Sequence, residues 1–256
     1  MPVYHPMRLV LDPPRRACLN MAIDEMLTEQ AVPCLRIYFW ERPSISIGYF
    51  QDVGESARLF QCGKKNIPVV RRLTGGGLVL HGKDLTFSLI LRSDNPFLPA
   101  DVKESYLKVA EALRAGLKDS YRGLDYARCA ETTSTRVKQR DRICFQQSSC
   151  HDLLWRDRKV MGASQRRLRG MILHQSAVFL DEDKKTLTGK IVRGFEKSWK
   201  ISFREQPLTE SEVEKAGRIE SERYSSKRWA FGVWPSLSSR SIRGNYRAVL
   251  QACGRS

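Results

Sequence analysis

Residues 69–91, VVRRLTGGGLVLHGKDLTFSLIL, place two arginines just before three consecutive glycines. A glycine run lets the main chain approach a ligand closely because no Cβ stands between them. Arg71 and Arg72 beside it can pair with phosphate or carboxylate oxygens. The same residues also suit a tight hairpin with exposed arginines. On their own they favour a ligand-binding loop and a plain turn about equally.

Within this stretch, residues 77–84 read GLVLHGKD and differ from a phosphate-binding P-loop in their last residue. A P-loop needs a hydroxyl residue after its lysine to bind Mg²⁺, and a helix directly behind it. Here Asp84 follows Lys83, and the next residues, LTFSLIL, alternate and are rich in strand formers. Because both requirements fail, we do not predict a P-loop.

A second candidate centre combines thiols with a lysine. Cys144 and Cys150 precede residues 152–164, which read as a hairpin with its turn near Asp157 and which carry Lys159. A neighbouring ammonium favours the thiolate form of a cysteine, and the thiolate is the nucleophile. Cys144 lies in the charged segment RDRICFQQSS, which offers little to bury a thiol. The competing interpretations are a small buried cysteine and a solvated turn lysine.

The chain of 256 residues carries a formal net charge of +16, which is unevenly placed. Residues 131–170 hold ten basic and four acidic side chains, and residues 225–256 hold six and none. Such a surface attracts acidic partners, either nucleic acid or acidic protein. The sequence shows no helix-turn-helix signature, zinc spacing or aromatic stacking pattern that would support nucleic acid. It also has no apolar run of the roughly 18 residues that a membrane span requires.

The seven cysteines are scattered and form no Cys-x-x-Cys pair. Neither a disulfide framework nor a metal site is therefore predicted. The first residues lack the basic and apolar regions of a secretory signal. We expect a cytoplasmic protein with reduced thiols.

The expected elements run as one helix, several strands, a second helix, more strands and then helices. Apolar residues recur at helical spacing in residues 18–30 and 101–119, where Val102 and Tyr106 are expected on the buried stripe. Thr209 opens another helix with a capping box that Glu212 completes. Residues 129–147 read as a long loop. This order is a mixed α+β pattern rather than alternating βαβ units, with strands expected at residues 34–41, 44–50, 67–72, 78–81, 85–91 and 170–181.

The stretch around the glycines resembles the catalytic core of the lipoate–protein ligase A and cysteine octanoyltransferase family, in the biotin/lipoate protein ligase superfamily. LNMAIDE (19–25), SIGYFQ (46–51) and RKVMGASQR (158–166) resemble its first helix, its second strand pair and its lysine-bearing hairpin. The family pattern is Arg-Arg-x-x-Gly-Gly-x-x-Val-x-His followed by a strand with Thr and Ser. It is matched by Arg71, Arg72, Gly75, Gly76, Val79, His81, Thr86 and Ser88.

This resemblance covers about residues 7–232 and implies an α+β fold of mixed, mostly antiparallel sheets packed with helices. It places the catalytic domain at residues 1–203, a helical cap of the same domain at 204–234 and a basic tail at 235–256. Only about 50 residues follow Phe203, too few for the full accessory domain that some ligases of the family carry.

Two chemistries occur in the family. Ligases activate lipoate with ATP and Mg²⁺ as lipoyl-adenylate, whereas octanoyltransferases form a cysteine thioester and need no cofactor. In the ligase-like octanoyl-[acyl carrier protein]:protein N-octanoyltransferases the reactive cysteine forms a Cys-Phe pair fifteen residues before the lysine, and Cys144-Phe145 stands at that distance from Lys159. Ser88 also follows His81 at the spacing of the transferases. The chain is therefore most similar to these transferases.

The resemblance implies that Cys144 and Lys159 are catalytic and that no metal is bound. The main-chain N–H groups around Gly162 and Ala163 become candidate donors to an oxyanion. Residues implied in binding the acyl group or substrate are Arg71, Arg72, Gly75, Gly76, Gly77, His81, Ser88, Gly162, Ala163 and Ser164.

Two departures from the family pattern bear on substrate contacts. The family often has Asp after its His, where this chain has Gly82, and its usual His-Gly or His-Ala pair is Gln175-Ser176 here. His174 lies one position early, and a one-residue shift in a strand turns a side chain to the other face. We therefore expect that His174 does not replace the family histidine, and a repurposed paralogue stays an alternative.

We expect an acyltransferase of the protein lipoylation pathway. It would transfer an octanoyl (or lipoyl) group by way of Cys144 to a lysine of a lipoyl-domain protein, with octanoyl-acyl carrier protein as the donor of octanoyl. Acceptors of this kind are glycine cleavage H protein and the E2 lipoyl domain of a 2-oxoacid dehydrogenase. Acidic partners suit the positive charge. The alternatives are an ATP-dependent lipoate–protein ligase and, ranked lowest, a basic nucleic-acid-binding module.

Overall fold

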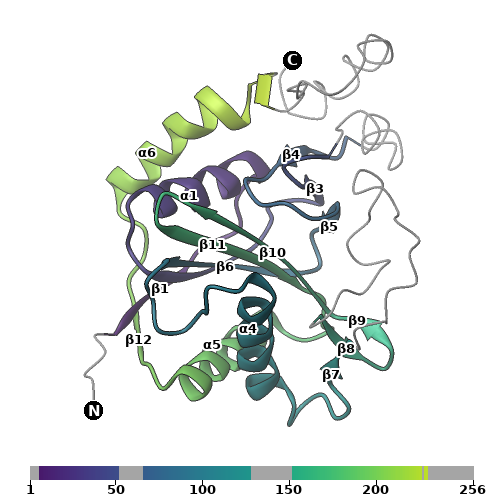
Figure 1. The fold of residues 1–256 in the computed structure, drawn as a ribbon. Coiled ribbons are helices and arrows are strands. Elements are labelled where there is room, and N and C mark those ends of the chain that lie inside the picture. The colour runs from purple at the N-terminus through teal and green to yellow at the C-terminus, as the bar shows by residue number, and fades with distance from the viewer. Residues whose placement is uncertain (1–5, 52–65, 128–151, 227, 230–256) are drawn as a thin grey trace.

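The computed structural model describes residues 6–51, 66–127, 152–226 and 228–229, and it shows an α+β fold (Figure 1). A mixed six-stranded sheet runs through the middle. Its neighbours are antiparallel from β10 to β2 and parallel from β2 to β12. In spatial order the strands are β10 (Met161–Leu168), β11 (Met171–Val178), β6 (Leu85–Arg92), β2 (Cys34–Tyr38), β1 (Met7–Leu11) and β12 (Phe203–Glu205).

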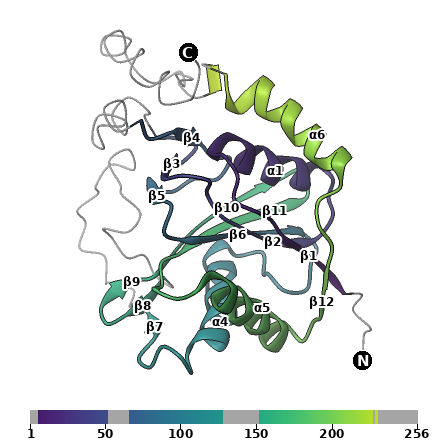
Figure 2. The ribbon, with the colours of Figure 1, turned by 180° about the vertical axis from the view of Figure 1, so that it is seen from behind.

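Helices cover both faces of this sheet (Figures 1 and 2). On one face lie α1 (Ala17–Glu29), α6 (Glu210–Ile219) and the π-helical turn η2 (Glu220–Tyr224); on the other lie α4 (Val102–Leu117) and α5 (Lys184–Trp199). The strands β6 and β11 are buried along almost their whole length because helices pack above and below them. Apolar side chains from the sheet fill a core on each side.

Two small sheets complete the fold. The first has the order β4 (Val69–Arg71), β3 (Ser44–Ile47), β5 (Val79–His81), and the second has the order β7 (Asp125–Tyr126), β8 (Leu153–Trp155), β9 (Arg158–Lys159). Between β8 and β9 the turn residues Arg156 and Asp157 both have positive φ, 51° and 59°. A two-residue turn with positive φ at both positions matches the twist of the strands that it joins.

The structure confirms the predicted helices at 18–30 and 101–119, the strands and the hairpin turn near Asp157. The capping box of Thr209 and Glu212 also forms as predicted. The prediction for Val102 was wrong: it stands at the first position of α4, 45% exposed. The sequence pattern did not predict α5, whose glycines and threonines have low helix propensity.

The expected loop at 129–147 and the basic tail at 235–256 lie outside the described residues. Strand β12 runs across the expected boundary at residue 203 and joins the main sheet beside β1. Arg8 of β1 in turn pairs with Glu212 of α6 at 2.7 Å. In the part of the chain that the structure describes, no helix is long and apolar enough to cross a membrane.

Candidate active site

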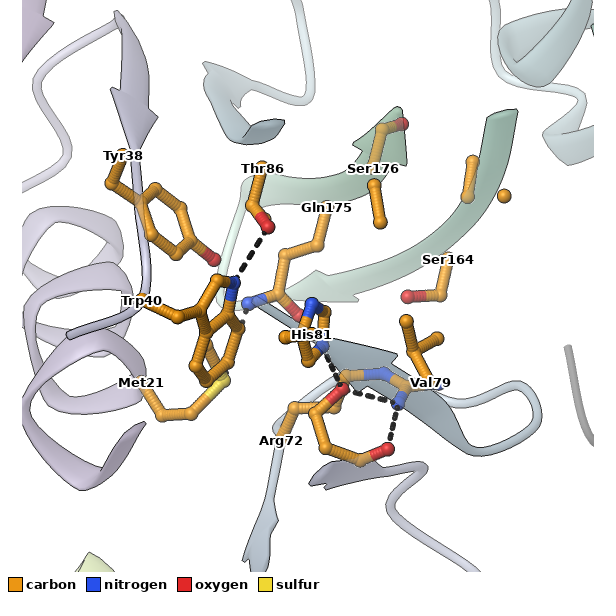
Figure 3. A pocket seen from close by; sticks show the side chains of 14 residues that line it. Met21, Tyr38, Trp40, Arg72, Val79, His81, Thr86, Ser164, Gln175 and Ser176 are labelled. Carbon is orange, nitrogen blue, oxygen red and sulfur yellow. Dashed lines mark hydrogen bonds between the residues drawn. The ribbon is translucent and has the colours of Figure 1, made fainter. Parts of the chain in front are cut away.

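A pocket opens between the small sheet of β3 and β5 and the main-sheet strands β6, β10 and β11, with α1 closing one side (Figure 3). Trp40 and His81 stand against each other on one wall, and Ser164 and Gln175 reach in from the opposite strands. Its lining is Met21, Tyr38, Trp40, Ser46, Arg72, Val79, His81, Thr86, Gly162, Ala163, Ser164, Gln175, Ser176 and Ala177.

Arg72 forms part of this lining, but its guanidinium donates to groups of the protein itself. Nη1 donates to the carbonyl and the hydroxyl oxygen of Ser46, at 3.2 and 3.1 Å. Nη2 donates to the carbonyls of Gly75 and Gly77, at 2.6 and 2.7 Å. Arg72 therefore ties strand β3 to the glycine loop.

Arg71 performs a similar task on the neighbouring loop and does not line the pocket. Its Nη1 donates to the carbonyls of Tyr49 and Gln51 at 2.7 and 2.8 Å. Its Nε donates to the carbonyl of Trp229, whose indole N–H donates back to the carbonyl of Arg71 at 3.0 Å. The sequence offered both arginines as partners of phosphate or carboxylate, but the structure engages both with main-chain carbonyls.

The glycines serve a close approach between two loops. A Cβ on Gly48 would lie 2.1 Å from the carbonyl oxygen of Gly76, so the two main chains can touch only without a side chain there. Gly76 has φ of +85°, and a Cβ on it would lie 3.1 Å from Arg72 Nη2. None of the three glycines Gly75, Gly76 and Gly77 is among the residues that line the pocket.

His81 is held from several directions. Its ring stacks on Trp40, with ring centroids 3.8 Å apart, its Nε2 lies 2.8 Å from Ser46 Oγ, and its Nδ1 lies 2.7 Å from Asp84 Oδ2. Burial acts to raise the pKa of the Asp84 carboxyl. The interaction with His81 and the hydrogen bonds from Thr86 and the Gly82 N–H outweigh burial, so that this pKa is lowered.

A series of buried, hydrogen-bonded polar side chains lies under the wall that Ser164 and Gln175 form. Thr74 Oγ1 donates to Gln175 Oε1 at 2.6 Å and lies 2.8 Å from Ser164 Oγ. Gln175 Nε2 donates to the carboxylate of Asp24 at 2.7 Å. Ser88 reaches the same carboxylate at 2.6 Å, so it supports the pocket from beneath and does not line it.

Asp24 is also bound to Arg36, which is fully buried. Arg36 Nη1 lies 2.6 Å from Asp24, and Nη2 lies 2.6 Å from Asp12. The hydroxyl of Tyr38 donates to Asp24 at 3.1 Å. Burial raises the pKa of Tyr38 well above its ordinary value, and the negative charge of Asp24 is the second cause. The phenol therefore stays a neutral donor.

The departure in β11 is placed as the alternation predicts. Gln175 faces the pocket, and His174 faces away from it, fully buried near Phe87 and Tyr106. Burial lowers the pKa of His174 to about 3, so the ring is neutral. His174 therefore does not replace the family histidine.

Lys159 lies at the end of β9, outside the pocket lining. Its Nζ is 2.6 Å from Asp152 Oδ2, and the two side chains are only 5% and 9% exposed. A solvated turn lysine, the competing interpretation of the sequence, does not describe this buried ion pair.

The structure thus brings five of the predicted residues together at the pocket: Arg72, His81, Gly162, Ala163 and Ser164. Arg71, Ser88 and Lys159 lie elsewhere with partners of their own. Cys144 lies outside the described residues. Sequence reasoning missed the pocket residues Ser46 and Trp40, and the carboxylates of Asp84 and Asp152.

The sequence and the fold match a known class of proteins. A profile of the lipoyl protein ligase A/B catalytic domain matches residues 16–213. This chain belongs to that family.

Two curated relatives show which members of the family the chain resembles. The chain is 31% identical to octanoyltransferase LipM of Halalkalibacterium halodurans, over 85% of this chain and 95% of that protein. It is 38% identical to octanoyltransferase LipM of Carboxydothermus hydrogenoformans, over 64% of this chain and 61% of that protein.

Solved structures show the same fold. One is lipoate-protein ligase A bound with ATP, with a TM-score of 0.73 and 26% identity, covering 90% of this chain and all of that one. Another is Ta0514, a lipoate protein ligase homologue of T. acidophilum with bound lipoic acid, with a TM-score of 0.74, 26% identity and the same coverage. These two solved structures are thus named for lipoate ligation, whereas the two sequence relatives are named as octanoyltransferases.

Proposed function

We infer that this protein is an octanoyltransferase that transfers an octanoyl group to a lysine of a lipoyl-domain protein. The observation that carries this inference is the 31% identity with an octanoyltransferase across nearly the whole of both chains. The chain is thus an acyltransferase of the protein lipoylation pathway.

We propose octanoyl-acyl carrier protein as the donor, with glycine cleavage H protein or an E2 lipoyl domain as the acceptor. The net charge of +16 supports acidic partners of this kind because opposite charges speed docking. Reduced thiols, which the scattered cysteines favour, and these partners are consistent with a cytoplasmic enzyme.

The proposed reaction has two acyl transfers. The thiolate of Cys144 attacks the thioester carbonyl, the bond to the carrier sulfur breaks, and that sulfur leaves as a thiolate that takes up a proton. The acceptor amine then attacks the new thioester, loses a proton, and displaces Cys144 as a thiolate. Each step passes through an oxyanion, which main-chain N–H groups can stabilise.

Two features of the described residues support these steps. Gly162 and Ala163 line the pocket from β10, which among the described strands is the edge of the six-stranded sheet and therefore directs alternate N–H groups away from β11. Lys159 stands three residues earlier in a fixed ion pair with Asp152. We propose that this ammonium favours the thiolate of Cys144 and relays protons between the two transfers.

The rival is an ATP-dependent lipoate ligase, which the ATP-bound fold neighbour favours. The donors of Arg71 and Arg72 count against phosphate binding at this loop because they are engaged with carbonyls of residues 46–51, 75, 77 and 229. Strand β5 likewise leads through the turn at residues 82–84 into strand β6 and not into a helix, so no helix N-terminus follows it to receive a phosphate.

A donor comparison tests the assignment. The purified protein is mixed with a lipoyl domain and either octanoyl-acyl carrier protein alone or ATP, Mg²⁺ and lipoate. We expect the acceptor to gain one octanoyl mass in the first mixture and no mass in the second. Modification only in the ATP mixture would make the protein a ligase. Modification in neither would leave it a repurposed member of the family.

A further inference from the structure

Asp84 receives three hydrogen bonds, although it does not line the pocket. Oδ2 lies 2.7 Å from His81 Nδ1 and accepts from Thr86 Oγ1 at 2.6 Å, and Oδ1 accepts from the Gly82 N–H at 2.9 Å. The carboxylate is 1% exposed at the residue level. A buried carboxylate with several donors is fixed in place, and it fixes its donors in return.

One line of contacts runs from this carboxylate to the glycine loop. Asp84 contacts His81, whose Nε2 lies 2.8 Å from Ser46 Oγ. Ser46 Oγ accepts from Arg72 Nη1 at 3.1 Å, and Arg72 Nη2 donates to the carbonyls of Gly75 and Gly77. Three of the linked side chains, those of His81, Ser46 and Arg72, line the pocket.

The ends of this line, together with a neutral His81, set the direction of every hydrogen bond in it. An arginine can only donate, and an ionised carboxylate can only accept. Ser46 therefore accepts from Arg72, and when His81 is neutral Ser46 donates its own proton to His81 Nε2. His81 in turn carries its proton on Nδ1 and donates it to Asp84. In neutral His81 the carboxylate selects this tautomer, because the opposite one would turn a lone pair toward Asp84.

A second line runs from Asp84 to the aromatic wall. Thr86 donates to Asp84, and its oxygen accepts from the indole N–H of Trp40 at 2.8 Å. Trp40 then stacks on His81. The side chains of Trp40 and Arg72, both seen in Figure 3, are thus both linked to the one carboxylate of Asp84.

The position of Asp84 also bears on Gly82, which stands directly after His81 where the family often has Asp. Gly82 has φ of +131°, and a Cβ there would lie 3.2 Å from the main chain of Pro43. A side chain directly after His81 would therefore be strained. The chain supplies its carboxylate from two residues further on, through the turn that leads into β6.

We propose that Asp84 is a positioning residue for acyl binding: acting through His81 and Ser46 it holds Arg72 and the glycine loop, and acting through Thr86 it holds Trp40. This role in acyl binding rests on the proposed function. The tautomer that Asp84 imposes on His81 does not depend on the proposed function. Replacement of the carboxylate should weaken binding of the acyl group more than it slows the transfer itself.

The test compares Asp84→Asn with Asp94→Asn, which removes an exposed carboxylate paired with Arg92 just beyond the other end of β6. We expect Asp84→Asn to raise the KM for octanoyl-acyl carrier protein about tenfold with a much smaller change in kcat, and Asp94→Asn to change neither. Ser46→Ala should raise KM similarly, and the double variant should be no worse than either single one, because both break one line. An unchanged KM in Asp84→Asn, or additive effects, would refute the proposal.

A spectroscopic readout keeps the test valid should a variant lose stability or the wild type show no transfer. The ¹⁵N shifts of the imidazole report which nitrogen carries the proton, and His81→Asn assigns the signal among the four histidines. We expect wild-type His81 protonated on Nδ1 and Asp84→Asn showing the other tautomer or a mixture. A wild-type Nε2–H tautomer would overturn the proposal. Titration with octanoate alone, tighter in wild type than in Asp84→Asn, supports it independently of transfer.

Discussion

Arg36 and Arg72 are both buried arginines near the pocket, but their partners differ in kind. Arg36 lies beneath the pocket between the carboxylates of Asp12 and Asp24, all of them charged and nearly inaccessible. Arg72 lies in the wall and donates to a serine and to carbonyl oxygens, all of them neutral. The first arginine therefore belongs to an ionic core, and the second to a set of loops.

This difference predicts how each region fails. Removal of a charge from a buried ion pair leaves its partner uncompensated, which costs several kcal/mol. Loss of a donor to a carbonyl costs about 1–3 kcal/mol for the unsatisfied group. Damage to the ionic core should therefore appear as lost stability, and damage to the wall as lost activity with most of the stability retained.

The largest expected effect is that of Arg36→Met. Asp12 and Asp24 would keep their burial and lose their shared cation, and we expect the free energy of unfolding to fall by about 4 kcal/mol or more. Urea denaturation measures it. Arg15→Met is the matched control, since Arg15 pairs with the same Asp12 but is more exposed, and it should cost about 1 kcal/mol or less. Equal losses of unfolding free energy in both variants would contradict the distinction between the ionic core and the pocket wall.

Next comes Lys159→Met, which removes the ammonium from the ion pair with Asp152. Both side chains are buried, so we expect a loss of about 3 kcal/mol together with loss of transfer. The double variant Lys159→Met with Asp152→Asn removes both charges and should recover most of the stability but none of the transfer. A stable double variant with near wild-type turnover would show that the lysine serves the fold alone.

A pH-dependent effect follows from His174, whose pKa is lowered to about 3 by burial. A histidine titrates near pH 6.5 in the unfolded chain, so below that pH the unfolded state binds a proton that the folded state refuses. The stability contributed by the neutral ring is complete above pH 6.5 and is lost as the pH falls toward 3. Between pH 7 and pH 5 we expect His174 to lower the free energy of unfolding by about 2 kcal/mol.

The variant His174→Phe isolates this effect. Phenylalanine keeps an aromatic ring beside Phe87 and Tyr106 but has no titrating group, so stability should change between pH 7 and pH 5 by about 2 kcal/mol less than in wild type. Urea curves at the two pH values supply the comparison. The same pH dependence in both proteins would contradict the buried neutral ring.

The smallest stability effect is expected for Gly76→Ala. Gly76 has φ of +85°, and a Cβ would press on Arg72 Nη2, which we expect to cost about 1–2 kcal/mol. Transfer should fall further than this loss suggests, since Arg72 is part of the pocket wall. Gly75→Ala controls for composition: its Cβ would meet nothing within 4 Å, and its φ is not positive. Equal activity in the two variants would mean that the loop does not position Arg72.

Much of the fold could be predicted because its signals are local. The apolar spacing of α1 and α4, the capping box of α6 and the alternation in β6 are each complete within a few residues. Helix α5 was not predicted because its stability comes from packing against α4 rather than from helix-forming residues.

The candidate site was predictable only in part. Arg72 and His81 reach the pocket as their motif implied, but the sequence could not show that Arg72 would turn its donors to carbonyls. Asp84 served in the sequence only to exclude a P-loop, and Asp152 drew no attention. Their roles depend on which side chain the turn or hairpin brings opposite them, and that is set by three-dimensional packing.

The central claim is that octanoyl passes through a thioester on Cys144. The direct measurement is the intact mass of the protein after mixing with octanoyl-acyl carrier protein in the absence of ATP. We expect one added octanoyl mass that hydroxylamine removes, that peptide mapping places on Cys144, and that persists in Cys150→Ala but not in Cys144→Ala. An adduct on Cys150 would show that Cys150, and not Cys144, is the nucleophile. Full lipoate transfer by Cys144→Ala with ATP would contradict the account.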